Sequence, residues 1–190
     1  MQNANANTES EKNANATTKN ASATQFTSGL VSVVTPCYNG ESFLDRYFES
    51  ILAVTGEFIM WPDSDDLMYP DNLKKKVDYL NTHPNTGFVC CRVNRVREGS
   101  LNRVISIDKV SDPSNPWIFD ALIRDKGVYC LDIAYLARTE ALFSALGGRR
   151  IVESPAGQNY QLLLPLAYCN RCGFINEALV AYVVREGSHS

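Results

Sequence analysis

Short apolar runs alternate along the chain with amphipathic stretches, and proline, glycine or polar clusters separate them. Residues 30–35 are apolar on both faces, so they predict a buried strand of a parallel sheet. Shorter apolar runs at 57–61 and 87–93 predict two more strands. Residues 128–135 and 178–184 have the same character. The pattern therefore predicts a central sheet.

Between these strands, apolar residues recur at the spacing of one helix face. Leu73, Val77 and Leu80, for example, follow Pro70, which suits a first helical turn. The predicted helices are 41–52, 70–83, 117–123, 138–146 and 159–168. Residues 112–116 contain two prolines and read as a loop. Alternating strands and helices indicate an α/β sandwich, a mostly parallel sheet flanked by helices.

The first 29 residues differ from the rest, because they are rich in Asn, Ala and Thr and hold one aromatic residue, Phe26. Such a segment buries too little apolar area to offset the entropy of ordering it. We therefore expect residues 1–29 to be a disordered tail and residues 30–190 to form one domain.

Composition narrows the classes of function. The 190 residues carry 18 Lys and Arg against 21 Asp and Glu, a net charge of −3, which disfavours a nucleic-acid partner. No apolar run is long enough to cross a bilayer, and no secretory signal begins the chain. We expect a cytoplasmic protein whose cysteines are reduced and buried: Cys37, Cys90, Cys91, Cys130, Cys169 and Cys172.

The most informative feature is an acidic cluster, Asp63, Asp65 and Asp66, directly after the predicted strand 57–61. Ligands bind at the carboxyl ends of strands in open α/β sheets. Asp63 and Asp65, two residues apart in extended chain, project to one side and suit Mg²⁺ or Mn²⁺. The alternative is that these aspartates only make turns and cap the following helix.

Three segments in the right order resemble family 2 glycosyltransferases, an inverting group with the GT-A fold. Residues 31–40 (VSVVTPCYNG) are similar to the family's opening strand and turn, and residues 55–66 (TGEFIMWPDSDD) to the strand that carries its Asp-x-Asp metal motif. Residues 182–190 (YVVREGSHS) resemble the end of such domains, whereas residues 94–127 contribute little. The resemblance implies a GT-A sandwich, with transfer of a sugar from a nucleotide-diphosphate donor.

The resemblance also implies where the donor binds. Thr35, Pro36 and Tyr38 would line the nucleotide end of the first strand, and Asp63 would lie close to the sugar nucleotide. The donor would be a UDP-, GDP- or dTDP-sugar, with UDP first. The acceptor would be a glycan or glycolipid in cell-surface polysaccharide synthesis, reached from the cytoplasm with possible peripheral membrane association.

Other residues are candidates for binding the metal and the leaving diphosphate. The resemblance makes Asp65 the direct metal ligand on which catalysis depends, with Asp63 beside it. Arg185 or His189 would approach the diphosphate from the tail, and His189 is a further candidate metal ligand. The alternative for His189, one residue from the end of the sequence, is a frayed, exposed side chain.

Two departures from the family pattern stand out. A β-α-β unit, at least ~30 residues, is missing between Leu52 and Ala53, so we expect an inner strand of the sheet and part of the base pocket to be absent. In the family pattern a Glu-Asp pair supplies the catalytic base, an aspartate. The matching positions here are the amides Gln158 and Asn159, which are not useful bases. Glu153 is the nearest carboxylate and the candidate base, or else an ordinary loop residue.

The sequence thus supports three hypotheses. The first is a metal-dependent, inverting glycosyltransferase. The second is a non-catalytic or truncated remnant of the same fold that acts, if at all, as an interaction protein. The third, an unrelated Mg²⁺-dependent phosphotransfer protein built on Asp63 and Asp65, does not account for the first and last matching segments.

Overall fold

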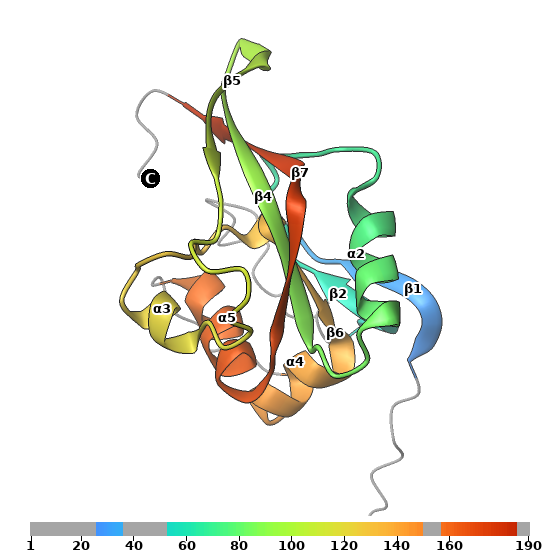
Figure 1. Ribbon diagram of the computed structural model, residues 1–190. Helices are drawn as coiled ribbons and strands as arrows, with labels where there is room; N and C mark the ends of the chain where they lie inside the picture. The colour runs from blue at the N-terminus through green and yellow to red at the C-terminus, as the bar shows by residue number, and fades with distance from the viewer. Residues whose placement is uncertain (1–25, 36–52, 150–156, 186–190) are drawn as a thin grey trace, which may run out of the picture.

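The computed structural model describes residues 26–35, 53–149 and 157–185. Seven strands form one mixed sheet (Figure 1). Six of them follow the order β1-β2-β6-β4-β7-β3, and the seventh, β5, pairs with residues 93–97 of β4. The strands are β1 (Thr27–Val33), β2 (Gly56–Met60), β3 (Leu67–Met68), β4 (Phe88–Arg97), β5 (Ser100–Asp108), β6 (Tyr135–Arg138) and β7 (Cys172–Val184). The predicted α/β architecture is confirmed, but the sheet is not mostly parallel as expected, because four of its six strand pairings are antiparallel.

The strands that lead to the acidic cluster run in one direction. β1 is parallel to β2, and β4 is parallel to β7 along ten pairs of residues. β6 lies between the two pairs and is antiparallel to β2 and to β4, so the carboxyl ends of β1, β2, β4 and β7 face the same edge. The sheet is therefore mixed, and its parallel members still present a common carboxyl edge.

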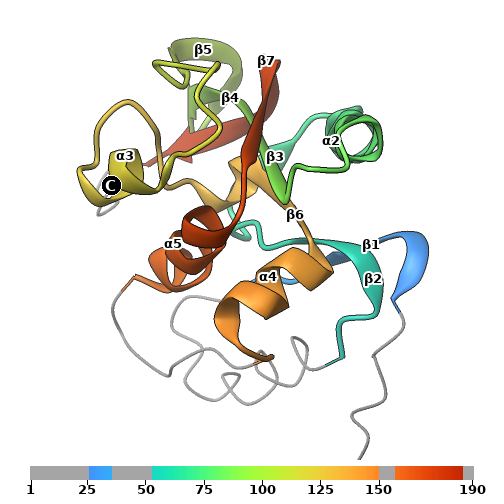
Figure 2. The same cartoon turned by 60° about the horizontal axis from the view of Figure 1, so that its bottom comes forward.

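Helices cover both faces of the sheet (Figures 1 and 2). The α2 helix (Asn72–Thr82) packs on β4 and β7 from one side. On the other side lie α3 (Phe119–Ile123), α4 (Thr139–Leu146) and α5 (Gln158–Cys169), with α5 between the other two. Four helices were predicted at these places, and each is confirmed to within a few residues; the predicted helix 41–52 lies outside the described residues.

The first strand is not buried as predicted. β1 begins at Thr27, before the expected start of the domain, and Leu30 and Val33 are 45% and 44% exposed. The reason is its place at the edge of the sheet, where β2 is its only partner among the described strands. The apparent absence of a β-α-β unit fits this sheet, because β1 pairs directly with β2, the next strand among the described residues.

Two other segments differ from the predictions. The strand predicted at 128–135 is instead irregular chain followed by a 3₁₀ turn, η2 (Asp132–Ala134), and β6 begins only at Tyr135. β5 was not predicted at all. It forms a hairpin with β4 through Glu98 and Gly99, whose φ of +80° suits glycine in a tight turn.

The core lies on both faces of β2, β4, β6 and β7. Phe58, Met60, Phe88 and Leu163 are fully buried. α2 contributes Leu80, and it also buries two polar residues, Asn72 and Lys76, that its apolar pattern did not predict. Asn72 donates a 2.9 Å hydrogen bond to the Leu179 carbonyl, and Lys76 donates one of 3.0 Å to the Ile133 carbonyl.

The cysteines within the described residues are free thiols, but they are not all buried. Cys90, Cys91 and Cys172 are buried, whereas Cys130 is half-buried and Cys169 is exposed. Cys37 lies outside the described residues.

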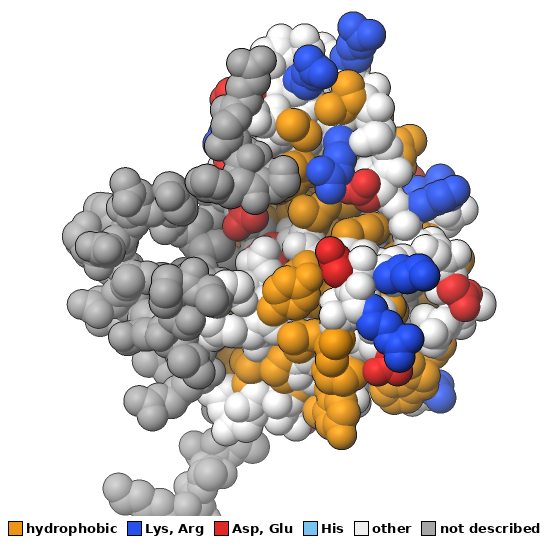
Figure 3. Space-filling model, turned by 90° about the vertical axis from the view of Figure 1, so that its left-hand side faces the viewer, with side chains coloured by type: hydrophobic (Ala, Val, Ile, Leu, Met, Phe, Trp, Pro, Cys, Tyr) orange, Lys and Arg blue, Asp and Glu red, His pale blue; other side chains and the backbone are white. Residues whose placement is uncertain are grey.

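Hydrophobic side chains also reach the surface, where they form a band among Lys and Arg on the face shown in Figure 3. The exposed ones include Leu101, Ile105 and Ile107 of β5, and Trp117 and Tyr168. β5 is exposed along nearly its whole length because, of the strands that the structure describes, it pairs with β4 alone.

Candidate functional site

The acidic cluster lies at the carboxyl end of β2, as predicted. β2 ends at Met60, and buried Trp61 leads into the segment 63–66. One carboxylate oxygen from each of Asp63, Asp65 and Asp66 lies within 4.8 Å of the others. Asp63 and Asp66 are half-buried and Asp65 is exposed, so the group opens to solvent on one side.

Asp66 ties the cluster to the last strand. Its Oδ1 accepts a 3.0 Å hydrogen bond from the Val183 N–H of β7. β3, immediately after it, pairs with Val180 and Ala181 of β7. The alternative role as a helix cap is not observed: the N-cap of α2 is Asp71, and it makes no side-chain capping bond. The segment is thus held at both ends by β2 and β7.

Arg185 reaches the same place from the end of β7. Its Nη1 lies 2.9 Å from Asp65 Oδ2, and its Nε lies 3.2 Å from Glu98 Oε1 in the β4–β5 turn. The three side chains are partly exposed, so each ion pair is screened by water. Their importance is positional: a guanidinium stands directly beside the candidate metal ligands.

Burial and mutual repulsion change the acidity of the cluster. Burial raises the pKa of Asp63, and the charge of Asp65 adds to the effect. Burial also raises the pKa of Asp66 to about 6, with the charges of Asp65 and Asp63 adding to it and the Val183 N–H opposing it. Carboxylates that repel one another in this way gain from a shared cation.

One acidic residue near the cluster escaped the sequence analysis. Asp132 of η2 is only 2% exposed, and burial raises its pKa to about 9, with the charge of Asp63 as the next cause. The charge of Asp66 adds to it, whereas the Trp61 indole lowers it. An aspartate inside the apolar run 128–135 was the available signal, because charged residues are rarely buried without a role.

The other predicted site residues are placed only in part. Thr35 is exposed just after β1, where the Val34 N–H donates to the Met60 carbonyl at the end of β2. Thr35 therefore lies at the same edge of the sheet as the acidic cluster. Pro36, Tyr38, Glu153 and His189 lie outside the described residues.

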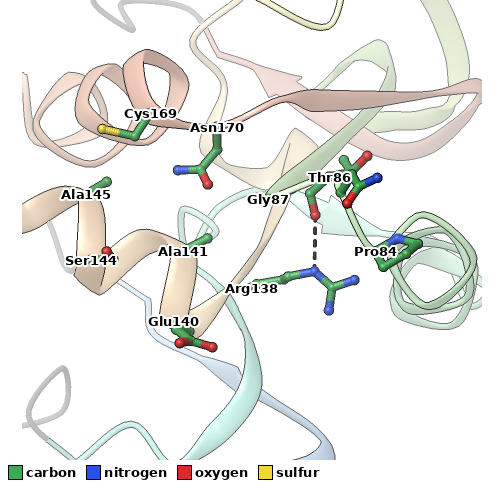
Figure 4. Close-up of a pocket in the computed structure, with 11 residues that line it drawn as sticks. Pro84, Thr86, Gly87, Arg138, Glu140, Ala141, Ser144, Ala145, Cys169 and Asn170 are labelled. Carbon is green, nitrogen blue, oxygen red and sulfur yellow. Dashed lines mark hydrogen bonds between the residues drawn. The ribbon is translucent and has the colours of Figure 1, made fainter.

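A hollow of about 370 Å³ lies elsewhere, at the amino ends of β4 and β7 (Figure 4). Arg138 lines it, but its Nε and Nη2 already donate to the Thr86 and Leu80 carbonyls at 3.1 and 2.6 Å. Because β7 runs from this hollow to the acidic cluster, the two occupy opposite ends of the strand. The hollow is not part of the candidate site.

Residues 51–134 match the family model described as "Glycosyl transferase family 2". The match covers less than half of the chain, and we call these residues the family 2 segment. This family 2 segment includes the acidic cluster and Asp132, and it begins next to the junction of Leu52 and Ala53. No curated protein matches the chain.

Solved structures support the fold. The structure of S. aureus TarS is 17% identical with a TM-score of 0.51, covering 74% of this chain and 24% of TarS. TarS 1-349 gives 17% identity and a TM-score of 0.50, covering 73% of this chain and 39% of that one. The complex of TarS 1-349 with UDP-GlcNAc gives 17% identity and a TM-score of 0.47, covering 75% of this chain and 39% of that one. The first two likenesses confirm the GT-A fold, and the chain spans well under half of these proteins.

Among the described residues, no helix is both long enough and apolar enough to span a bilayer.

Proposed function

We propose that this protein is a metal-dependent, inverting glycosyltransferase that moves a sugar from a nucleotide-diphosphate donor to an acceptor hydroxyl. The observation that carries the proposal is the group of three carboxylates at the carboxyl end of β2, within the family 2 segment. A sheet edge of this kind is where α/β proteins bind ligands, and clustered carboxylates suit a hard cation.

Asp63 and Asp65 would hold Mg²⁺ or Mn²⁺. Their oxygens are of the hard type that these ions prefer, and they lie close enough to Asp66 to share one ion. Asp66 is the anchor of the group, because one of its oxygens already accepts the Val183 N–H. When bound, the cation supplies positive charge that offsets the negative charge of a leaving diphosphate. His189 remains a candidate further ligand.

The donor is proposed to be a UDP-sugar. TarS, whose fold this chain shares in part, has been crystallised with UDP-GlcNAc and with UDP. Thr35, exposed at the same edge of the sheet as the acidic cluster, would meet the nucleotide, together with Pro36 and Tyr38, which follow it in the sequence. Arg185, beside Asp65, would pair with the diphosphate. A GDP- or dTDP-sugar is the alternative.

Glu153 is the proposed base that takes the proton from the acceptor hydroxyl as the nucleoside diphosphate leaves. The amides Gln158 and Asn159 at the start of α5 cannot do so. The acceptor is proposed to be a glycan or glycolipid of a cell-surface polysaccharide, met in the cytoplasm or at the inner face of the membrane.

A non-catalytic remnant of the fold is the second candidate. The observation that favours it is β1, an exposed edge strand next to the junction where a β-α-β unit is missing from the sequence. A remnant would fold and yet bind neither cation nor nucleotide.

The metal assignment predicts the outcome of Asp65→Asn. We expect this variant to lose Mn²⁺-dependent UDP binding, measured by calorimetry, because the amide removes a charged ligand from the cluster. Its thermal unfolding without metal should match the parent, because Asp65 is exposed and lies outside the core. Asp78→Asn, which changes an exposed aspartate paired with Lys74 on α2, is the matched control and should bind as the parent does. Equal UDP and Mn²⁺ binding by Asp65→Asn and the parent would refute the assignment.

A further inference from the structure

Arg185 contacts two carboxylates that come from different parts of the chain. Its Nη1 lies 2.9 Å from Asp65 Oδ2 in the acidic cluster, and its Nε lies 3.2 Å from Glu98 Oε1 in the β4–β5 turn. Under the proposed function the cation takes Asp65 as a ligand and so competes with Arg185 for it. The contact with Glu98 does not involve a metal ligand, so it would be the contact that remains in the loaded site.

The backbone fixes Glu98 beside Arg185. β4 and β7 pair in parallel as far as Arg97 and Val184, the residues that directly precede these two. The Glu98 N–H then donates to the Val184 carbonyl at 3.1 Å. Both side chains therefore leave the ends of two paired strands, and the hydrogen bond keeps their starting points together.

The contact uses the inner edge of the guanidinium. An arginine side chain offers five N–H groups in a rigid, planar fork, and Nε carries only one of them. A carboxylate that holds Nε fixes the direction of this plane. The Nη groups stay directed at the acidic cluster, as the contact of Nη1 with Asp65 shows. Groups of this kind bind phosphate oxygens in a bidentate manner.

Neither stability nor charge explains the presence of Glu98 at this position. Its side chain is 66% exposed and that of Arg185 is 40% exposed, and ion pairs as exposed as this contribute little to folding. A negative charge next to a site for a diphosphate would by itself repel that ligand. Holding Arg185 is the role that agrees with the contacts.

We propose that Glu98 is a positioning residue: through Nε it holds the Arg185 guanidinium in the orientation in which its Nη groups meet the diphosphate of the donor once the cation has taken Asp65. The inference rests on the proposed function. It gives the β4–β5 turn a part in donor binding, although Glu98 itself would not touch the donor.

Two substitutions at Glu98 separate its hydrogen bond from its charge. Glu98→Gln keeps an oxygen that can accept the Nε–H and removes the charge, whereas Glu98→Ala removes both. The measurement is the Kd of the full 190-residue chain for UDP with Mn²⁺, by calorimetry. We expect Glu98→Gln to bind UDP at least as tightly as the parent, since one repelling charge is gone. Glu98→Ala should bind about 1.4–5-fold more weakly than Glu98→Gln, the range for an exposed ion pair.

The same two substitutions at Glu177 are the matched control. Glu177 is an exposed glutamate of β7 that pairs with Lys75 of α2. Both variants should bind UDP as the parent does. Equal Kd values for Glu98→Gln and Glu98→Ala would overturn the inference, because Glu98 would then act through its charge alone or be an ordinary solvated turn residue.

The background of Arg185→Gln shows whether Glu98 acts through Arg185. In that background the difference between Gln and Ala at position 98 should disappear, because the group being positioned is absent. A difference that persists would overturn the inference. Thermal unfolding without metal should be the same for Glu98→Gln and Glu98→Ala, since the side chain is exposed. A lower Tm for Glu98→Ala, in step with its weaker binding, would assign the effect to the turn and also overturn the inference.

The remaining outcomes distinguish the inference from the proposed function. If the parent binds UDP with Mn²⁺ and Arg185→Gln binds it equally well, the inference fails and the metal site stands. If the parent binds no nucleotide in the presence of Mn²⁺, the proposed function and the inference fail together.

Discussion

Arg185 and Asp65 show how the site balances its charge at the level of single residues. Three carboxylates gathered within 4.8 Å repel one another, and the Arg185 guanidinium, 2.9 Å from Asp65, partly offsets that repulsion. Glu98 holds the same guanidinium from the β4–β5 turn. A cation that binds Asp65 must therefore compete with Arg185 for this carboxylate.

Arg185→Gln should have opposite effects on the two ligands. Mn²⁺ alone should bind about 1.4–5-fold more tightly, because exposed ion pairs are worth about 0.2–1 kcal/mol and one competing for Asp65 is removed. UDP in the presence of Mn²⁺ should bind more weakly, because the diphosphate loses a positive partner. Calorimetric titrations measure both, with Arg103→Gln on β5 as the control. Mn²⁺ affinity that is unchanged or lower in Arg185→Gln would contradict this view of the pair.

At the scale of single residues, the sequence predicted the positions of site residues that lie together on one short segment. Asp63 and Asp65 follow a strand, so their place at the edge of the sheet could be predicted from their spacing alone. The bond from Val183 to Asp66 joins residues far apart in the chain, and no local pattern indicates it. Asp132 was missed for the same reason, since the groups that act on it, Trp61, Asp63 and Asp66, lie far from it in the chain.

Among the elements, the contact of α2 with β7 is closely fitted around a glycine. Gly173 of β7 faces the ring of Tyr79 on α2, and an added Cβ would overlap that ring. Tyr79 is itself stacked on His83 with ring centroids 4.1 Å apart, so it has little room to move aside. The absence of a side chain at Gly173 is what lets the helix lie on the strand.

Gly173→Ala should therefore destabilise the protein by about 1–3 kcal/mol, the usual cost of overpacking. Denaturant unfolding of Gly173→Ala, Tyr79→Ala and the double variant measures the effect. Because the clash needs both side chains, the double variant should lose less stability than the sum of the two single changes. Strict additivity would show that Gly173 and Tyr79 do not interact in this way.

The helices were predictable because their signals are local. α4 and α5 match their predicted ranges closely, and α4 ends at Gly147 in the left-handed conformation typical of a helix C-terminus. The strands were harder, because burial depends on neighbours that the sequence does not reveal. β1 is apolar but lies at an edge, and β5 is a real strand although it is exposed.

At the scale of the whole molecule, the sheet brings every described candidate to one edge. Thr35 follows β1, the acidic cluster follows β2, and Arg185 follows β7, and these three strands point the same way. The hollow around Arg138 occupies the opposite end of β4 and β7. The fold thus supplies one place where, under the proposed function, a cation and a nucleotide diphosphate would meet carboxylates and a guanidinium together.

The most direct test of the central claim is thermal unfolding of the chain with UDP, GDP or dTDP, each with Mn²⁺ and with a chelator. A nucleotide at a hundred times its Kd stabilises by about 2.7 kcal/mol. For a domain of this size that is a rise in Tm of roughly 5–10 °C, at ~2–4 °C per kcal/mol. The account predicts such a rise for UDP with Mn²⁺ and a much smaller one with the chelator. A cooperative transition that no nucleotide moves, with or without Mn²⁺, would contradict the account and favour the non-catalytic remnant.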